Sequence, residues 1–167
     1  MSKPLSDITV LDFGHVYNGP YCGFLLAMAG ARVIKIESPR GETLRARGPL
    51  SYPFAMLNSS KDTITLNIKS ERGQALLKQM VTKADVLLEN FAPGTMDRIG
   101  LGADAMREIN PRLVYASGSG YGKTGPNSEY LAMDLTIQAM TGVMSINGAA
   151  GDNQVGILTG TVNDQFQ

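Results

Sequence analysis

Residues 8–37, with the sequence ITVLDFGHVYNGPYCGFLLAMAGARVIKIE, decide the fold class of this chain. Residues 8–13 form a short apolar run typical of a buried strand, and residues 21–29 have the composition of a helix that Gly30 ends. Residues 32–37 are a second run rich in β-branched side chains. A strand, a turn, a helix and a second strand in succession predict two parallel strands joined by a right-handed helical crossover.

The same alternation continues along the rest of the chain, interrupted by an irregular excursion over residues 38–60. Ser70 is a predicted N-cap, and the apolar stripe of the helix that follows it is expected at Leu76, Leu77, Met80 and Val81. The other expected elements are strands at residues 63–67, 84–89 and 112–117 and helices at residues 103–109 and 134–143. This pattern predicts an α/β protein with a doubly wound, mostly parallel open sheet.

The composition is that of an ordinary globular protein. Of 167 residues, 43% are hydrophobic and 18% charged, which suits one domain over residues 1–167. Fifteen Lys and Arg residues balance fifteen Asp and Glu residues, so no net positive field favours nucleic acid or an anionic membrane. The single Cys22 cannot form an intramolecular disulfide, residues 1–7 lack the apolar run of a signal peptide, and residues 13–31 are too polar to span a membrane. We expect a soluble cytoplasmic protein with no nucleic-acid or membrane partner and, because no residues cluster with metal-ligand spacing, no metal.

Ligands of doubly wound sheets bind beyond the carboxyl ends of the strands. In this chain the loops at those ends are residues 14–20, 38–47, 90–94 and 118–126. The glycines of the first loop would let a ligand approach the backbone, and the helix N-terminus would favour an anion, but a tight structural turn is an equally good interpretation. His15, the only histidine, is either a general base or a packing residue.

Arginines occur in or near two of these loops. Arg40, Arg45 and Arg47 lie in the second, where their guanidinium groups suit phosphates and a solvated charged loop explains them equally well. Arg98 follows residues 90–94 at the place of a first helical turn, where it is either an adenine or phosphate contact or a surface residue.

A nicotinamide enzyme is a weaker alternative. Glu37 ends the second strand, as the ribose-binding acid of a dinucleotide site does. Gly14, Gly19 and Gly23, however, do not have the G-x-G-x-x-G spacing, and the glycines at 118, 120 and 122 do not lead into a helix.

Several short motifs between residues 10 and 142 are distinctive when taken together. They are VLDFGHV (10–16), GP (19–20), GARVIKIE (30–37), LNSSK (57–61), ADVLLENFAPG (84–94), DR (97–98), NPRLVY (110–115), GYGKTGP (120–126) and DLTIQAMTG (134–142). In this order and register they resemble the amino-terminal part of the class III coenzyme A transferases, the formyl-CoA and carnitine CoA-transferase family. The resemblance covers essentially the whole chain.

That resemblance implies a fold and an assembly. Members of the family are more than twice as long as this chain, combine a Rossmann-like large domain with a small domain, and form homodimers whose two chains interlock. The chain therefore resembles the N-terminal part of the large domain, without the small domain and without the C-terminal return of the chain.

The resemblance also implies site residues. It places the catalytic aspartate at Asp164, in the polar segment after the glycine-rich stretch. The residues that it implies for coenzyme A binding are His15, Val16, Asn18, Ser38, Leu66, Ile68, Lys69, Asn90, Phe91 and Arg98. Two positions depart from formyl-CoA transferase: Tyr17 replaces a glutamine that helps to stabilise the reacting carbonyl, and Ser38 replaces an arginine. A formyl or oxalyl substrate is therefore not carried over to this chain.

The implied chemistry needs one carboxylate and no permanently bound cofactor, with acyl-CoA and a carboxylic acid as the substrates. An ordinary aspartate, with a pKa near ~3.9, is ionised at neutral pH and can attack a thioester without a histidine. We expect Asp164 to form an acyl-aspartyl anhydride and then an aspartyl-CoA thioester on the way to the new acyl-CoA.

Other interpretations remain open at this point. The 167-residue chain is either part of a working transferase or a shortened module that binds coenzyme A, or assists assembly, without turnover. The racemase branch of the family places a histidine before the aspartate that matches Asp134, where this chain has Met133, so racemase is the weaker expectation. Asp134 itself opens a predicted helix and is expected to be structural.

Overall fold

The computed structural model describes residues 3–46 and 51–147 of the chain. The chain divides into two compact units, Met1–Gly118 and Ser119–Gln167, which are described separately below. The first contains the whole sheet, and the second contains two short helices in its described part.

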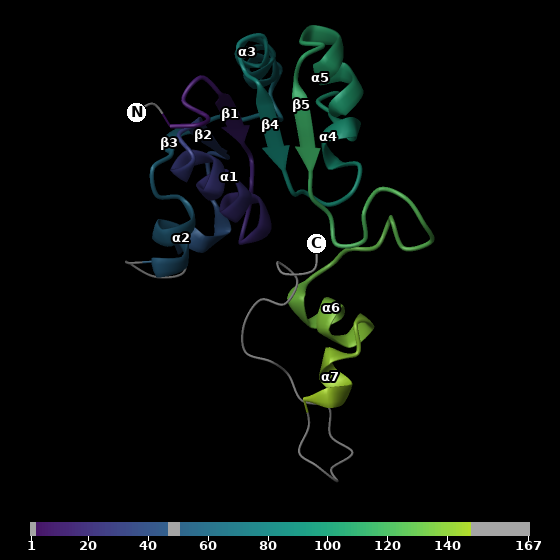
Figure 1. Ribbon diagram of the computed structural model, residues 1–167. Helices are drawn as coiled ribbons and strands as arrows, with labels where there is room; N and C mark the ends of the chain where they lie inside the picture. Colours follow the sequence, from purple (N-terminus) through teal and green to yellow (C-terminus); the bar gives the residue numbers. More distant parts are fainter. Residues whose placement is uncertain (1–2, 47–50, 148–167) are drawn as a thin grey trace. The chain divides into compact units, whose positions relative to one another are not determined.

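The first unit is built on a five-stranded sheet in the order β3-β2-β1-β4-β5 (Figure 1). All four neighbouring pairs are parallel, and β1 lies in the middle, with Val10 opposite both Val33 of β2 and Val86 of β4. The strands are β1 (Thr9–Asp12), β2 (Arg32–Glu37), β3 (Asp62–Thr65), β4 (Val86–Glu89) and β5 (Val114–Ser117). This all-parallel topology confirms the predicted doubly wound, Rossmann-like sheet.

Helices cover both faces of the sheet, because successive strand residues point to opposite sides. On one face, Val10, Val33 and Leu88 pack with Ala27 of α1 (Asn18–Met28). On the other face, Leu11, Ile36 and Leu87 belong to a larger cluster with side chains of α3, α4 and α5. These helices are α3 (Glu71–Val81), α4 (Thr95–Arg98) and α5 (Ala103–Ile109).

The helix after β3 begins as its sequence predicts. The Ser70 hydroxyl accepts a hydrogen bond from the Gly73 N–H, which confirms the N-cap. Leu77 and Val81 are fully buried and Met80 packs against the core, but Leu76 is 43% exposed. The expectation that Leu76 belongs to the stripe that packs on the core was wrong, because the face of α3 that meets the sheet does not extend to Leu76.

Two helical segments of the first unit differ from the sequence prediction. The excursion at residues 38–60 contains a 3₁₀ turn, η1 (Thr43–Ala46), and a short helix, α2 (Tyr52–Leu57), with Pro53 in its first turn. The helix α1 begins at Asn18 and not at residue 21, since proline is tolerated in a first helical turn. The turn after β1 is therefore shorter than the predicted one.

The second unit contains α6 (Asp134–Met140) and α7 (Val143–Ile146). Gly142, with a φ of +79°, separates them, so the helix expected at residues 134–143 is two helices. Asp134 opens α6 and accepts a hydrogen bond from the Gln138 side chain at 2.7 Å, which agrees with a structural role. Within the described part of the chain, no helix combines the length and apolarity needed to cross a membrane.

Candidate functional site at the carboxyl edge of the sheet

The order in which strands are added to the sheet changes side between β1 and β4. β1 is followed by β2 on one side, whereas β4 and β5 extend the sheet on the other side. Loops that leave the carboxyl ends of these two strands diverge, and the crevice between them is the usual ligand site of doubly wound sheets. In this chain the corresponding place is where the turn after β1, which contains His15, meets the loop after β4, which contains Asn90.

Asn90 holds the turn after β1 through both polar atoms of its side chain. Its Oδ1 accepts a hydrogen bond from the His15 N–H at 2.7 Å, and its Nδ2 donates to the His15 carbonyl at 3.0 Å. Phe91, the next residue, places its ring 5.2 Å from the His15 imidazole and 6.4 Å from the Phe13 ring. Three residues expected at the coenzyme A site, His15, Asn90 and Phe91, are therefore brought together although 75 positions separate the first two.

The glycines of this turn serve chain packing. A Cβ on Gly14 would lie 2.5 Å from the Gly19 carbonyl carbon and 2.7 Å from an Asp12 carboxylate oxygen. A Cβ on Gly19 would lie 2.6 Å from the Gly14 Cα. The two glycines thus allow the turn to pass against the first turn of α1, which favours the structural interpretation of their spacing over ligand approach.

A fully buried ion pair lies beneath the turn. Lys61 Nζ is 2.7 Å from Asp12 Oδ2, and both side chains are 0% exposed. The ammonium group also donates to the Pro20 carbonyl at 2.8 Å and to Asn58 Oδ1 at 3.1 Å, while Asp12 Oδ1 accepts the Gly14 N–H. Burial lowers the pKa of Lys61, and the Asp12 carboxylate opposes that shift. The pair joins β1, α1 and the segment after α2.

A second buried lysine supports the turn from β2. Lys35, 1% exposed, donates its ammonium to the Gly14 carbonyl at 2.7 Å. Burial lowers its pKa, and the Asp12 carboxylate opposes this shift. Two charged strand residues, Asp12 and Lys35, therefore hold Gly14, the first residue of the turn, through its N–H and its carbonyl.

Two buried carboxylates lie at the end of β2 and in the loop that follows it. Glu42, 2% exposed, accepts the Val16 N–H at 2.9 Å, and its nearer oxygen lies 3.9 Å from His15 Nδ1. Glu37, 3% exposed, accepts two hydrogen bonds from the Arg45 guanidinium, both at 2.7 Å. Burial raises the pKa of Glu37, but the hydrogen bonds from Arg45 and from the Glu42 N–H outweigh burial and leave that pKa below its ordinary value.

The Arg45 guanidinium is therefore occupied by contacts within the protein. Its guanidinium pairs with Glu37 and lies 3.9 Å from the centre of the Phe54 ring, so phosphate binding by Arg45 is not supported. Arg40 is exposed, and Arg47 lies outside the described residues. Glu37, weighed as a ribose-binding acid, is occupied by the same ion pair.

His15 is a partly buried imidazole whose surroundings favour its neutral form. Its side chain is 27% exposed. Burial and the nearby Lys35 ammonium lower its pKa below 6.5, and the Glu42 carboxylate opposes them. The histidine can therefore donate or accept a hydrogen bond at neutral pH without carrying a charge.

The remaining expected binding residues also follow strand ends. Ser38, exposed, comes directly after β2, and its hydroxyl accepts the Arg40 N–H and donates to the Gly41 carbonyl, both at 3.3 Å. Leu66 and Ile68 follow β3 and pack partly against the core, and Lys69 beside them is exposed.

Asn18 and Arg98 are placed by helices. Asn18 is the first residue of α1. Arg98 is exposed at the end of α4, where it donates to the Pro93 carbonyl at 3.3 Å and to the Thr95 hydroxyl at 3.1 Å. Asp164, the expected nucleophile, lies outside the described residues.

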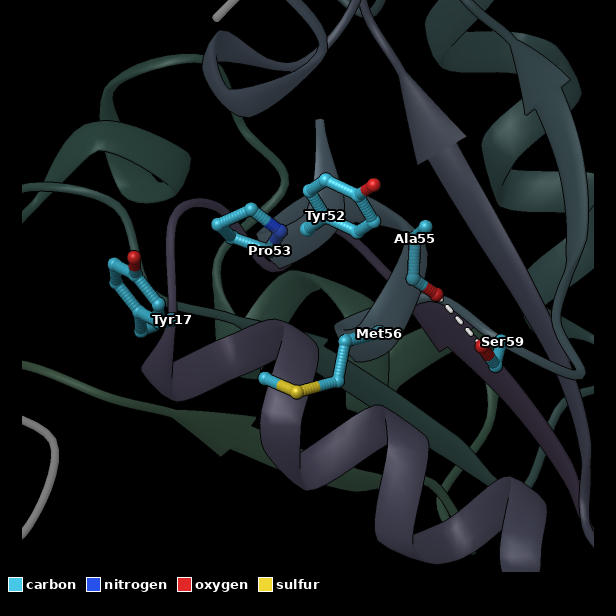
Figure 2. Close-up of a pocket in the computed structure, with 6 residues that line it drawn as sticks. All are labelled: Tyr17, Tyr52, Pro53, Ala55, Met56 and Ser59. Atoms are coloured by element: carbon cyan, nitrogen blue, oxygen red, sulfur yellow. Dashed lines mark hydrogen bonds between the residues drawn. The ribbon is translucent and has the colours of Figure 1, made fainter. Parts of the chain in front are cut away.

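Tyr17 borders an open apolar hollow of about 490 Å³ next to α2. Figure 2 shows the Tyr17 and Met56 side chains at this hollow, with Tyr52 and Pro53 above them. The lining residues are Tyr17, Tyr52, Pro53, Ala55, Met56 and Ser59. The sequence did not indicate this feature, because α2 was not predicted. Among residues 3–46 and 51–147, no group of three or more His, Cys, Asp or Glu side chains could hold a metal ion.

The sequence analysis also missed the buried polar residues beneath the turn. Asp12 and Lys35 follow apolar residues within their strands, and a charge at such a position is a signal of a buried pair. Glu42 and Lys61 have no comparable signal, since both lie in or next to the excursion between β2 and β3.

Known proteins resemble this chain in both sequence and fold. The sequence model of CoA-transferase family III matches residues 5–163. The chain is 47% identical over 150 residues to an acetyl-CoA:oxalate CoA-transferase of Acetobacter aceti, with 87% of this chain and 39% of that protein covered. It is 46% identical over 155 residues to a formyl-CoA:oxalate CoA-transferase of Streptomyces avermitilis, with 89% and 37% covered. The chain thus spans less than half of the length of these relatives.

Solved structures agree with the sequence relatives. A CAIB/BAIF family protein from Brucella suis has a TM-score of 0.86 and 35% identity, covering 94% of this chain and 44% of that one. A hypothetical protein from Mycobacterium tuberculosis has a TM-score of 0.89 and 34% identity, covering 98% and 49%. The family match over nearly the whole chain, together with the doubly wound sheet, establishes that this chain belongs to CoA-transferase family III.

Proposed function

We propose that this chain is the coenzyme A-binding part of an enzyme that moves coenzyme A from an acyl-CoA thioester to a carboxylic acid. The observation that carries this proposal is the family match over residues 5–163. The relatives act on different acids: one is named a succinyl-CoA–D-citramalate CoA-transferase, from Chloroflexus aurantiacus, and is 39% identical. The reaction class is therefore proposed without a particular acyl donor or acceptor.

The carboxyl edge of the sheet supports coenzyme A binding. His15, Asn90 and Phe91 meet beyond the carboxyl ends of β1 and β4, where doubly wound sheets bind their ligands. Lys69 and Arg98 are exposed cations at the same edge of the sheet, and both suit phosphate groups of the nucleotide. The amides of Gly14, His15 and Val16 are already bonded to side chains, so in this proposal side chains of the turn make the contacts with the ligand.

Asp164 is the proposed nucleophile. Its carboxylate oxygen attacks the thioester carbonyl carbon, the C–S bond breaks, and the products are an acyl-aspartyl anhydride and coenzyme A thiolate. The thiolate attacks the aspartyl carbonyl and releases the donor acid, which leaves an aspartyl-CoA thioester. The acceptor carboxylate displaces the thiolate in turn, and the thiolate then attacks the acceptor carbonyl of the new anhydride and frees Asp164. No permanent cofactor takes part in these steps, and water must be excluded throughout.

Assembly and compartment follow from the same proposal. Exposed apolar side chains on α1, namely Tyr21, Leu25 and Met28, are 50%, 49% and 52% exposed, which supports a further protein surface against this helix. We propose a homodimer of interlocked chains in the cytoplasm, with acyl-CoA and a carboxylic acid as its small-molecule partners.

A second candidate function is binding of coenzyme A without turnover. It is favoured by the described site, where His15, Asn90 and Phe91 meet and suit the binding of a ligand. In that case the carboxyl edge of the sheet would bind the nucleotide reversibly, and Asp164 would not become acylated.

Mass spectrometry after incubation with acetyl-CoA or succinyl-CoA separates the two functions. An acyl or coenzyme A adduct on the peptide that contains Asp164 supports transfer, and reversible binding without an adduct supports the binding module. Asp164→Ala should abolish the adduct, whereas Asp104→Ala, at an exposed position of α5, should retain it. An adduct or transfer activity that survives Asp164→Ala would rule out the proposed nucleophile.

A further inference from the structure

Val16 has a backbone conformation that its side chain disfavours. Its φ is +62°, in the left-handed region, and apart from glycines only Ser60 shares such a value among the described residues. A β-branched residue is rarely found there, because its branched Cβ crowds the backbone. A conformation of this kind persists only where the surrounding structure holds it in place.

Glu42 supplies that restraint. One of its carboxylate oxygens accepts the Val16 N–H at 2.9 Å, and the other accepts the Leu44 N–H at 3.1 Å. Glu42 is 2% exposed and Leu44 is 0% exposed, so the carboxylate is anchored in the interior while it reaches the turn. Charge-assisted bonds to backbone N–H groups are stronger than neutral ones, which suits a carboxylate for holding a strained peptide.

Glu42 is itself fixed from the end of β2. Its N–H donates to Glu37 Oε2 at 3.0 Å, and Glu37 is held by two hydrogen bonds from Arg45. A continuous set of bonds therefore runs from Arg45 through Glu37 and Glu42 to Val16, 26 positions earlier in the chain than Glu42. The restraint comes from the loop after β2 and acts on the turn after β1.

The neighbours of Val16 are His15, which the proposed function needs, and Tyr17. His15 precedes Val16, and its backbone is hydrogen-bonded to the Asn90 side chain. Tyr17 follows Val16 and borders the apolar hollow. A change in φ at Val16 rotates these two residues relative to each other, since φ is one of only two soft dihedrals per residue. The left-handed peptide thus sets the relative orientation of His15 and Tyr17.

We propose that Glu42 is a positioning residue for coenzyme A binding, which acts by holding Val16 in the left-handed conformation. This inference rests on the proposed function of the same edge of the sheet. Glu42 need not touch the ligand. Without the carboxylate, the turn populates the ordinary φ of valine, and only a fraction of the molecules is competent to bind.

The test uses the full chain with four variants: Glu42→Ala, Val16→Gly, the double variant, and Glu108→Ala as a control at an exposed position of α5. Glycine adopts positive φ without strain, so Val16→Gly removes the need for the restraint. We expect Glu42→Ala to weaken the Kd for coenzyme A about tenfold, and the double variant to bind within about threefold of Val16→Gly alone. Isothermal titration calorimetry measures the Kd, and the three-bond amide coupling of Val16 reports its φ by NMR.

Several results would overturn the inference. One is a folded Glu42→Ala variant that binds coenzyme A as the wild type does. Another is additivity, in which Glu42→Ala weakens the Kd for coenzyme A equally with and without Val16→Gly. That result would show that Glu42 has a structural role that does not act through Val16. If Glu42→Ala does not fold, Glu42→Gln keeps one acceptor oxygen and should show a smaller loss that Val16→Gly again removes; a loss that persists contradicts the inference.

The proposed function can fail separately. If the wild-type chain does not bind coenzyme A, that proposal is refuted for this chain, and the Val16 coupling then decides whether Glu42 holds the turn. A coupling that changes in Glu42→Ala supports the restraint, and an unchanged coupling overturns it.

Discussion

Removal of the Lys61 ammonium should unfold this protein more readily than any surface ion-pair change. In Lys61→Met the apolar stem remains, but Asp12 keeps a buried charge without its partner, and the Pro20 carbonyl and Asn58 Oδ1 lose a donor. Both members of the pair are 0% exposed, so water cannot replace the lost bonds without opening the structure. Breaking one side of a buried pair costs about 3–5 kcal/mol, a large part of the ~5–15 kcal/mol that stabilises a typical domain.

Urea denaturation followed by far-UV circular dichroism measures this loss as a change in the free energy of unfolding. Arg32→Met is the matched control, because Arg32 pairs with Asp62 at 3.1 Å in the same sheet with side chains 69% and 60% exposed. That exposed pair should be worth less than about 1 kcal/mol. A Lys61→Met loss as small as the Arg32→Met loss would refute the reasoning.

A double variant tests the origin of the effect. Asn at position 12 can still accept the Gly14 N–H, and it leaves no buried charge when Lys61 is methionine. Asp12→Asn with Lys61→Met should therefore cost about 2 kcal/mol less than the sum of the single changes. Simple additivity would show that the two side chains do not act as a pair.

Two further predictions concern the turn after β1. Burial, followed by the Lys35 ammonium, lowers the pKa of His15 in the folded state. The unfolded chain therefore binds a proton first as the pH falls through about 6.5, and the folded state loses stability below that pH. Urea titrations at about pH 7.5 and pH 5.5 should show a smaller pH-dependent loss for His15→Gln than for the wild type, and equal losses would contradict this sign. Asn90→Ala removes both hydrogen bonds to the His15 backbone and should lower the free energy of unfolding by about 2 kcal/mol, whereas Asn90→Asp keeps the acceptor and should lose less. An unchanged free energy of unfolding for Asn90→Ala would show that the two hydrogen bonds from Asn90 to the His15 backbone contribute nothing to stability.

Much of the fold was predictable because its signals are local. Apolar runs such as residues 8–13 and 32–37 alternate with helical segments, and crossover chirality then leaves few arrangements of parallel strands. The N-cap at Ser70 is another local signal, since the hydroxyl and the amide that it accepts from lie three residues apart. Short elements were harder: α2 has six residues and a proline, and its apolar side chains show no repeat of helical period.

The candidate site was predictable as an edge of the sheet and not as a set of contacts. Residues at strand ends, such as His15 and Asn90, follow from parallel topology once the strands are known. The sequence left Arg45 open between a phosphate contact and a solvated charge, and only the structure shows that its guanidinium pairs with Glu37. The roles of Glu42 and Lys61 depend on partners 26 and 49 residues away, beyond any local pattern.

The amino-acid sequence by itself determined the order of the five strands and of the main helices α1, α3, α5 and α6, the parallel sheet and the family. Hydrophobic periodicity, helix signals and motif register are properties of neighbouring residues. Tertiary structure alone decided the shape of the turn at His15 and Val16. Buried carboxylates, lysines and an amide from separate strands and loops converge there, and a buried charge or strained peptide persists only when distant groups satisfy it.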